Sequence, residues 1–206
     1  MEPPPTALRA DAARNRRRVL EAAERLFASG DARQVTMEDI ARAAGVGRAT
    51  IYRRFPTPAA VALELLDEHE RRLQEAIMRG EPPLGPGAPP ADRLAAFFEA
   101  MIGLLDDHLH LALGAETGGA RFATGAYQFW RAHVRHLLRE ARTGEPDAMV
   151  DILLAPLAPE LYRFQRYELG IGKEQIRAAL GVLARGVVAS EPPAGRTRQP
   201  KGSDIP

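Results

Sequence analysis

The residues with the clearest chemical potential are arginines and polar side chains within TMEDIARAAGVGRATIYRRF, residues 36–55 of this 206-residue chain. The stretch predicts two short helices joined by a tight turn at Gly45, which is the helix-turn-helix pattern. Ile51 and Phe55, four residues apart, would pack inward. The outer face of the second helix would then carry arginines, which can donate two hydrogen bonds to guanine O6 and N7 in the major groove. The spacing therefore predicts a DNA-reading helix.

The outward residues divide into base contacts and backbone contacts. Base edges would be met by Arg48 and Arg53, with Ala49 allowing close approach. Phosphate oxygens, which set register on the duplex, suit four polar or basic side chains: Thr36, Thr50, Tyr52 and Arg54. Thr36 also caps the first helix of the pair. The alternative is that these arginines only solvate an exposed helix, but their place in the second helix of the motif favours DNA contact.

The charge of the chain is uneven although its net value is only +1. Residues 1–58 hold eleven Arg against seven Asp and Glu, and the remaining residues hold 17 basic against 20 acidic side chains. A basic module joined to a mildly acidic one suits a reader of polyanions attached to a second unit.

The elements that must position these residues are helices. Strand signals are rare, while apolar residues recur at three- and four-residue spacing among Ala, Leu, Arg and Glu. The pattern predicts an all-α protein with helices over residues 14–29, 36–44, 48–55, 57–78, 91–113, 125–142, 145–169 and 173–189. Pro156 and Pro159 must kink or divide the segment 145–169. The Pro- and Gly-rich stretch 80–90 is expected to be a loop.

Composition excludes several classes of protein. The chain has no cysteine, so disulfides and thiolate chemistry are absent and a cytoplasmic location is expected. No apolar run approaches the roughly 20 residues of a membrane span, so no membrane contact is expected. Neither a nucleophile elbow nor a phosphate-binding glycine loop is present, and an enzyme is not expected. No cofactor is expected. His133 and His136, three apart on one helix, could bind zinc, but His108 and His110 point about 200° apart and cannot both join one site, so a metal is not expected.

Residues 19–66, VLEAAERLFASGDARQVTMEDIARAAGVGRATIYRRFPTPAAVALELL, resemble the DNA-binding domain of the TetR family of bacterial transcriptional regulators. The resemblance implies that Arg48, Ala49 and Arg53 face bases and that Thr36, Thr50, Tyr52 and Arg54 lie near the DNA backbone. Two positions depart from the family pattern. Pro58 stands where a phosphate-contacting lysine is frequent, and Gly47 stands where serine is common. A basic arm could compensate, formed by Arg14, Arg16, Arg17 and Arg18.

The same resemblance implies a second helical domain that dimerises and senses a small molecule. It divides the chain into a disordered arm (1–13), a helix-turn-helix domain (14–57), an effector and dimerisation domain (58–190) and a disordered tail (191–206). Homodimerisation would use the last two long helices, within 147–169 and 173–189. Candidate ligand-binding residues are Phe97, Met101, Phe122, Trp130 and His133, although each equally suits an ordinary helical core.

Together these expectations describe a dimeric repressor that binds a palindromic operator in double-stranded DNA and is released by a small-molecule effector. Two reading helices related by symmetry would supply the affinity that one short helix lacks. The alternative is an architectural or division-linked DNA-binding protein that has no effector.

Overall fold

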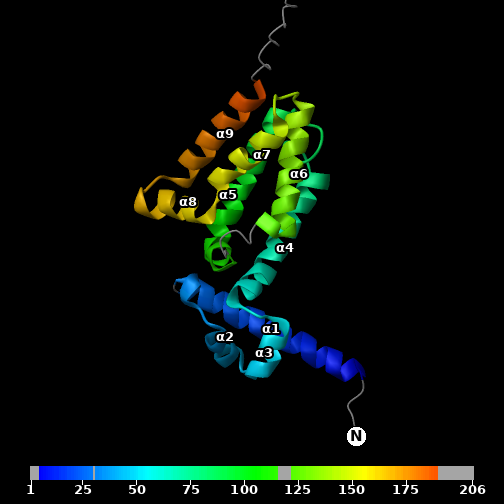
Figure 1. Cartoon of the computed structure of the whole chain (residues 1–206), viewed down its shortest axis with the longest axis vertical. Helices are drawn as coiled ribbons and strands as arrows, with labels where there is room; N and C mark the ends of the chain where they lie inside the picture. Colours follow the sequence, from blue (N-terminus) through cyan, green and yellow to red (C-terminus); the bar gives the residue numbers. More distant parts are fainter. Residues whose placement is uncertain (1–4, 30, 116–121, 190–206) are drawn as a thin grey trace, which may run out of the picture.

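The computed structural model describes residues 5–29, 31–115 and 122–189, and the regular elements within these ranges are all helical (Figure 1). The all-α prediction is therefore confirmed. The α-helices are α1 (Pro5–Ser29), α2 (Met37–Ala44), α3 (Arg48–Arg54), α4 (Pro58–Arg79), α5 (Pro90–Ala115), α6 (Gly125–Glu140), α7 (Pro146–Leu154), α8 (Pro159–Arg163) and α9 (Lys173–Ala189). Short turns of 3-10 helix cover Ala32–Gln34 and Ala155–Leu157, and a π-helical turn, Phe164–Glu168, continues α8.

Helices α1, α2 and α3 gather at one end of the molecule, and α4 leads from them to the helices at the other end (Figure 1). Helices α1, α2 and α3 share a small core in which Val19, Phe27, Ile40, Ile51 and Phe55 are almost fully buried. Their apolar residues lie three or four positions apart, so each helix turns a single stripe inward. This packing holds α3 with its opposite face outward.

Helix α5 is the centre of the larger unit, because α4, α6, α8 and α9 all pack against it. Its buried residues include Leu94, Phe97, Phe98, Met101 and Ile102, and they recur at helical spacing. The end of α5 also reaches α1, since a Cβ built on Gly114 would lie 3.3 Å from the Phe27 ring. The two ends of the molecule are thus joined both by the chain and by side-chain packing.

A polar cluster ties the last helices to α5. The Asp106 carboxylate accepts hydrogen bonds from the Tyr162 hydroxyl at 2.6 Å and from Lys173 Nζ at 2.7 Å, and Arg166 Nε lies 3.5 Å away. Partial burial works against the charged form of Asp106, but these donors outweigh it and lower the pKa of the carboxyl. The cluster therefore fixes α8 and the start of α9 on the core.

The start of the first helix differs from the sequence-based expectation. Helix α1 begins at Pro5, so residues 5–13, which we expected to be a disordered arm, are helical. Proline is tolerated in the first turn of a helix, and the following Ala, Leu and Arg residues are strong helix formers. The segment 145–169 is divided, as its prolines predict, with α7 ending at Leu154 and α8 beginning at Pro159. The expected tail, 191–206, lies outside the described residues.

Candidate DNA interface and ligand pocket

The turn between α2 and α3 is built by local hydrogen bonds. Thr36 Oγ1 accepts from the Asp39 amide at 3.2 Å while the Asp39 carboxylate accepts from the Thr36 amide at 3.2 Å, a capping box that begins α2. The Thr36 hydroxyl also donates to the Asp39 carboxylate, and this hydrogen bond, followed by the one from the Thr36 amide, lowers the pKa of Asp39. Gly45 ends the helix with a φ of 61°, a left-handed conformation that costs residues with a β-carbon about 1 kcal/mol or more. The predicted cap and turn are both confirmed.

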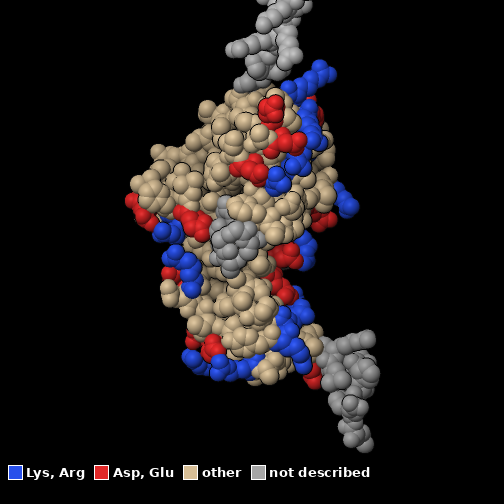
Figure 2. Space-filling view, in the orientation of Figure 1, with Lys and Arg blue, Asp and Glu red and all other residues tan. Residues whose placement is uncertain are grey.

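The two faces of α3 separate as the spacing predicts. Ile51 and Phe55 are only 1% and 3% exposed, so they anchor the helix on the core. The predicted DNA-facing residues on α3 all lie on the surface: Arg48, Ala49, Thr50, Tyr52, Arg53 and Arg54. Figure 2 shows basic side chains along the end of the molecule that carries α2 and α3. This end therefore presents cationic and hydrogen-bonding groups to an approaching anion.

The first turn of α2 contributes a carboxylate that the sequence analysis did not single out. Glu38 forms an ion pair with Arg48, and the Tyr52 hydroxyl donates to Glu38 Oε1 at 3.1 Å. A hydrogen bond from its own backbone amide, and then the one from Tyr52, lower the pKa of Glu38. Arg53, by contrast, has no hydrogen bond or ion pair with the residues that the structure describes. The two candidate base-reading arginines thus differ in their freedom to reach DNA.

The arginines of α1 are partly engaged within the protein. Arg16 forms an ion pair with Glu64 of α4, which also lies 3.4 Å from Arg54. Arg18 Nη2 donates to the carbonyl oxygen of Gly45 at 3.3 Å and so supports the turn. Arg14 forms an ion pair with Asp11 within α1. A role in phosphate contact stays a prediction for these residues.

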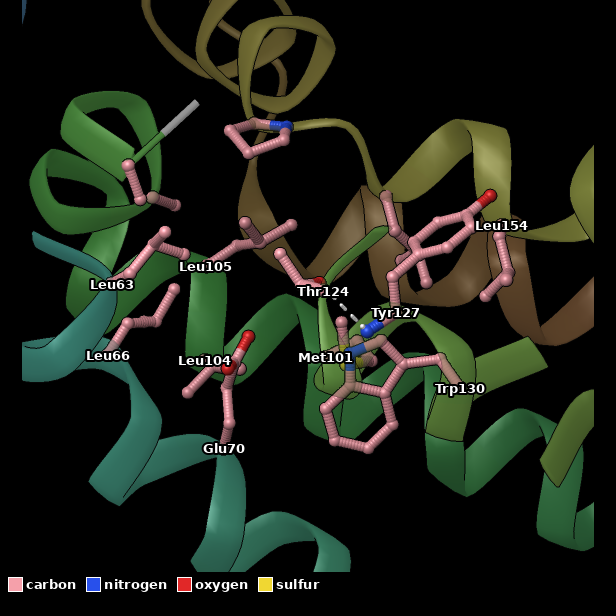
Figure 3. A pocket seen from close by; sticks show the side chains of 14 residues that line it. Leu63, Leu66, Glu70, Met101, Leu104, Leu105, Thr124, Tyr127, Trp130 and Leu154 are labelled. Atoms are coloured by element: carbon pink, nitrogen blue, oxygen red, sulfur yellow. Dashed lines mark hydrogen bonds between the residues drawn. The ribbon is translucent and has the colours of Figure 1, made fainter. Parts of the chain in front are cut away.

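A cavity of about 140 Å³ lies between α4, α5, α6 and the segment around α7 and α8 (Figure 3). Its volume is close to that of an engineered protein cavity that binds benzene, roughly 150 Å³. Most of the side chains around it are aliphatic or aromatic: Leu63, Leu66, Met101, Leu104, Leu105, Ala112, Ala115, Trp130, Leu154, Leu157 and Pro159. The other lining residues are Glu70, Thr124 and Tyr127.

The five predicted ligand-binding residues fall into three places. Met101 and Trp130 line the cavity. Phe97 and His133 lie behind it in the core, with ring centroids 5.3 Å apart, and Phe97 packs on Trp130 at 5.9 Å. Phe122 lies outside the lining, is 46% exposed, and contacts the ring of Tyr127. An aromatic residue near a cavity can thus support its wall from behind or lie on the outer surface.

Glu70 is the acidic residue among those lining the cavity, and sequence reasoning did not single it out. Burial among apolar side chains, and then the nearby Asp67, raise the pKa of its carboxyl to about 7. In the sequence, Glu70 stands in the polar run DEHERR of residues 67–72, which reads as the solvated side of an amphipathic helix. No local signal distinguishes it from its neighbours.

The histidines do not gather around a metal. The rings of His69 and His108 stack with centroids 3.7 Å apart, at a kink where His108 has a φ of −129°. Over residues 5–29, 31–115 and 122–189, no group of three or more His, Asp or Glu side chains could hold a metal ion. None of the described helices combines the length and apolarity that a membrane span needs.

Residues 19–65 match the family model of the bacterial regulatory proteins of the tetR family. The match covers the end of α1, the capped α2, the turn and the whole of α3. Over these residues the chain is similar to the bacterial regulatory proteins of the tetR family.

Relatives and fold neighbours of this chain are also transcriptional regulators or share their helical fold. HTH-type transcriptional regulators from two strains of Mycobacterium tuberculosis are 36% identical over 95 residues, which is 46% of this chain and 46% of theirs. The fatty acid degradation regulator FadR from Bacillus halodurans shares the fold with a TM-score of 0.62 at 16% identity, covering 89% of this chain and 96% of FadR. The complex of SmeT with triclosan has a TM-score of 0.56 at 15% identity, covering 84% and 90%.

The two departures from the common TetR pattern, Gly47 and Pro58, both lie at the start of a helix. Gly47 occupies the N-cap of α3 without a side-chain hydrogen bond, so that the end of the helix is left with uncapped amides. Pro58 is the first residue of α4, and Thr57 caps that helix by accepting from the Ala60 amide at 3.2 Å. The proline position thus serves the start of a helix and offers no cation to a phosphate.

Proposed function

We propose that this chain is a transcriptional regulator that binds a palindromic operator as a homodimer, and that a small-molecule effector releases it as a repressor. The observation that carries the proposal is the exposed face of α3, which a capped helix and a left-handed glycine hold outward on a domain similar to that of the tetR family. Arg48, Ala49 and Arg53 would read bases in the major groove. Thr36, Thr50, Tyr52 and Arg54 would grip the backbone.

Dimerisation is supported by apolar side chains left on the surface of the last helices. Val182 is 67% exposed and Tyr167 is 66% exposed, values unusual for such residues unless a partner covers them. Others extend the same surface over α8, the following turn and α9: Leu161, Phe164, Leu169 and Leu183. We call these six residues the α8–α9 surface. A second copy packed there would pair two reading helices and give the operator its two-fold symmetry.

Effector control is supported by the way the cavity adjoins the helix-turn-helix. Helix α4 begins at Pro58, four residues after α3 ends, and carries Leu63, Leu66 and Glu70 into the cavity wall. Helix α5 carries Ala112 and Ala115, and its neighbouring Gly114 packs near Phe27 of α1. A ligand that favours one arrangement of α4 and α5 would change the separation of the two reading helices. A fold neighbour, SmeT, has a structure in complex with triclosan, which supports a small-molecule ligand for this fold.

The proposed division of labour places residues 14–57 in DNA binding and residues 58–190 in sensing and dimerisation. We expect the protein to act in the bacterial cytoplasm, where its DNA target lies. An architectural DNA-binding protein without an effector would not need the cavity, so the cavity favours the regulator.

The test is a binding titration against labelled DNA from upstream of the chain's own gene, over a range of salt concentrations. We expect a steep decrease of affinity with salt, because phosphate contacts release counterions. The variant Arg48→Ala with Arg53→Ala should lose at least about tenfold in affinity, since each arginine–guanine pair contributes about 1–3 kcal/mol. Arg79→Ala, at the far end of α4, is the control and should bind as the unmodified protein does. Unchanged affinity in the double variant would show that α3 is not the reading helix.

A further inference from the structure

The cavity beside α4 contains one acidic side chain, that of Glu70, which has no hydrogen-bond or ion-pair partner among the described residues. Apart from the indole N–H of Trp130, three lining side chains carry polar groups, namely those of Glu70, Thr124 and Tyr127. Thr124 Oγ1 accepts from the Tyr127 amide at 3.2 Å, and the Tyr127 hydroxyl donates to Asp151 at 3.0 Å. The carboxylate of Glu70 makes no hydrogen bond or ion pair with any residue that the structure describes. Two of the three polar groups are therefore occupied, and Glu70 is not.

The orientation of Glu70 directs its carboxylate into the cavity. Figure 3 shows the side chain projecting from α4 toward the space between Leu104 and Trp130. The lining contributes no basic side chain that could neutralise it. Arginines do occur nearby in the sequence at 71 and 72, but neither belongs to the wall of the cavity. An ionised carboxylate here faces a mostly apolar surface, which is costly without a counter-charge.

We propose that the cavity binds a small organic ammonium ion, with an aromatic or branched apolar body, and that Glu70 is its counter-ion. The apolar walls would take the body of the ligand, and the aromatic rings of Tyr127 and Trp130 attract cations through their faces. The ammonium group would donate to the Glu70 carboxylate, the bond that the cavity lacks within the protein. Because burial raises the pKa of Glu70 to about 7, the carboxyl binds either a proton or a cation in this place. An acidic ligand would be repelled by the carboxylate, and a neutral donor could form a hydrogen bond with it but would supply no counter-charge.

This inference rests on the proposed function, since it names the class of effector for the same cavity. Its consequence for DNA binding follows from the position of Glu70. The residue lies on α4, the helix that continues directly from the reading helix, so an ion pair at Glu70 would bias the position of α4.

The test uses the full chain and a series of phenylalkylamines of increasing chain length. Each amine is matched to the phenylalkanol and the phenylalkanoate of the same length. Calorimetry measures binding, and DNA titrations with and without each compound measure release. We expect at least one amine to bind at least about tenfold more tightly than its matched alcohol, because a charged hydrogen bond away from water contributes about that much. That amine should also lower the affinity for DNA.

Variants distinguish the contribution of the Glu70 carboxylate to binding from that of the rest of the cavity. Glu70→Gln should reduce amine affinity by about 10- to 100-fold while leaving the affinity for the matched alcohol within about threefold. Glu75→Gln, which changes an exposed carboxylate on the same helix, is the matched control and should leave both affinities unchanged. Thermal unfolding confirms that each variant is folded, and Glu70→Asp, which keeps the charge, should retain a preference for amines.

The outcomes distinguish this inference from the proposed function. If no amine binds, or if Glu70→Gln binds the amine as tightly as the unmodified chain, the assignment of an ammonium ligand is wrong. Release of DNA by an alcohol or alkanoate alone would then still support effector control. Failure of the unmodified chain to bind DNA at all would instead contradict the proposed function, whatever the cavity binds.

Discussion

The ion pair between Glu38 and Arg48 predicts an unusual result, namely that removing an acidic residue of α2 tightens DNA binding. Arg48 must leave Glu38 before both of its guanidinium donors can reach a guanine, whereas Arg53 has no such partner among the described residues. The pair is exposed, with 70% of the Arg48 side chain and 39% of the Glu38 side chain accessible. Exposed pairs contribute about 0.2–1 kcal/mol. The proposed dimer would break two of them on binding, which corresponds to about two- to thirtyfold in operator affinity.

The substitution to make is Glu38→Gln, because glutamine keeps an acceptor for the Tyr52 hydroxyl while removing the charge. Fluorescence anisotropy against the operator should show tighter binding within that range. The same substitution in an Arg48→Ala background is the control, and it should tighten binding much less, since the competition for Arg48 is gone. Equal tightening in both backgrounds would mean that Glu38 acts only by repelling phosphates. Weaker binding by Glu38→Gln would mean that the carboxylate positions Arg48 for DNA, and the reasoning would be refuted.

Three further predictions concern stability and assembly. Burial, with the positive charges of Arg93 and His136, lowers the pKa of His133 from 6.5 to about 4. Between pH 4 and 6.5, therefore, His133 is protonated in the unfolded chain and neutral in the folded chain. The free energy of unfolding should therefore decrease below about pH 6.5, and His133 should account for a decrease of about 2 kcal/mol by pH 5. Urea titrations at pH 8 and pH 5 should show a smaller decrease for His133→Leu than for the unmodified chain. Tyr162→Phe removes the hydroxyl donor to Asp106 and should lower the free energy of unfolding by about 2 kcal/mol, measured by urea titration, with little change if the bond contributes nothing. On the α8–α9 surface, Val182→Glu should convert a dimer to a monomer in light scattering and weaken operator binding, while a dimer that persists would place the interface elsewhere.

Much of the candidate DNA interface was predictable because its determinants are local. Thr36 and Asp39 are three residues apart and cap the same helix, and Gly45 supplies the turn from its own backbone. Ile51 and Phe55 are four apart, so their common burial follows from helical geometry. The start of α1 was placed too late because the apolar spacing that indicates a packed helical face begins only at Val19. The helix extends back to Pro5, a residue that is compatible with a first helical turn.

The pairing of side chains from distant segments was not predictable in this way. Asp106 meets Tyr162 and Lys173, which are 56 and 67 residues further along the chain. Glu38 meets Arg48 across the turn, at a distance set by the crossing of α2 and α3. Such contacts depend on how helices pack, and packing angles have several common solutions for the same apolar pattern.

The sequence by itself determined the helices, the outward face of α3 and the resemblance to the TetR family, because these depend on residue types at fixed spacing within one short segment. Only the tertiary structure decided which carboxylate faces the cavity. Glu70 stands in a run of charged residues on α4, and its surroundings change from water to apolar side chains because α5 and α6 pack over that turn of the helix. The apolar stripe of a helix predicts that other helices pack against it. How far the buried surface extends beyond the stripe depends on where those helices lie, which the stripe alone does not determine.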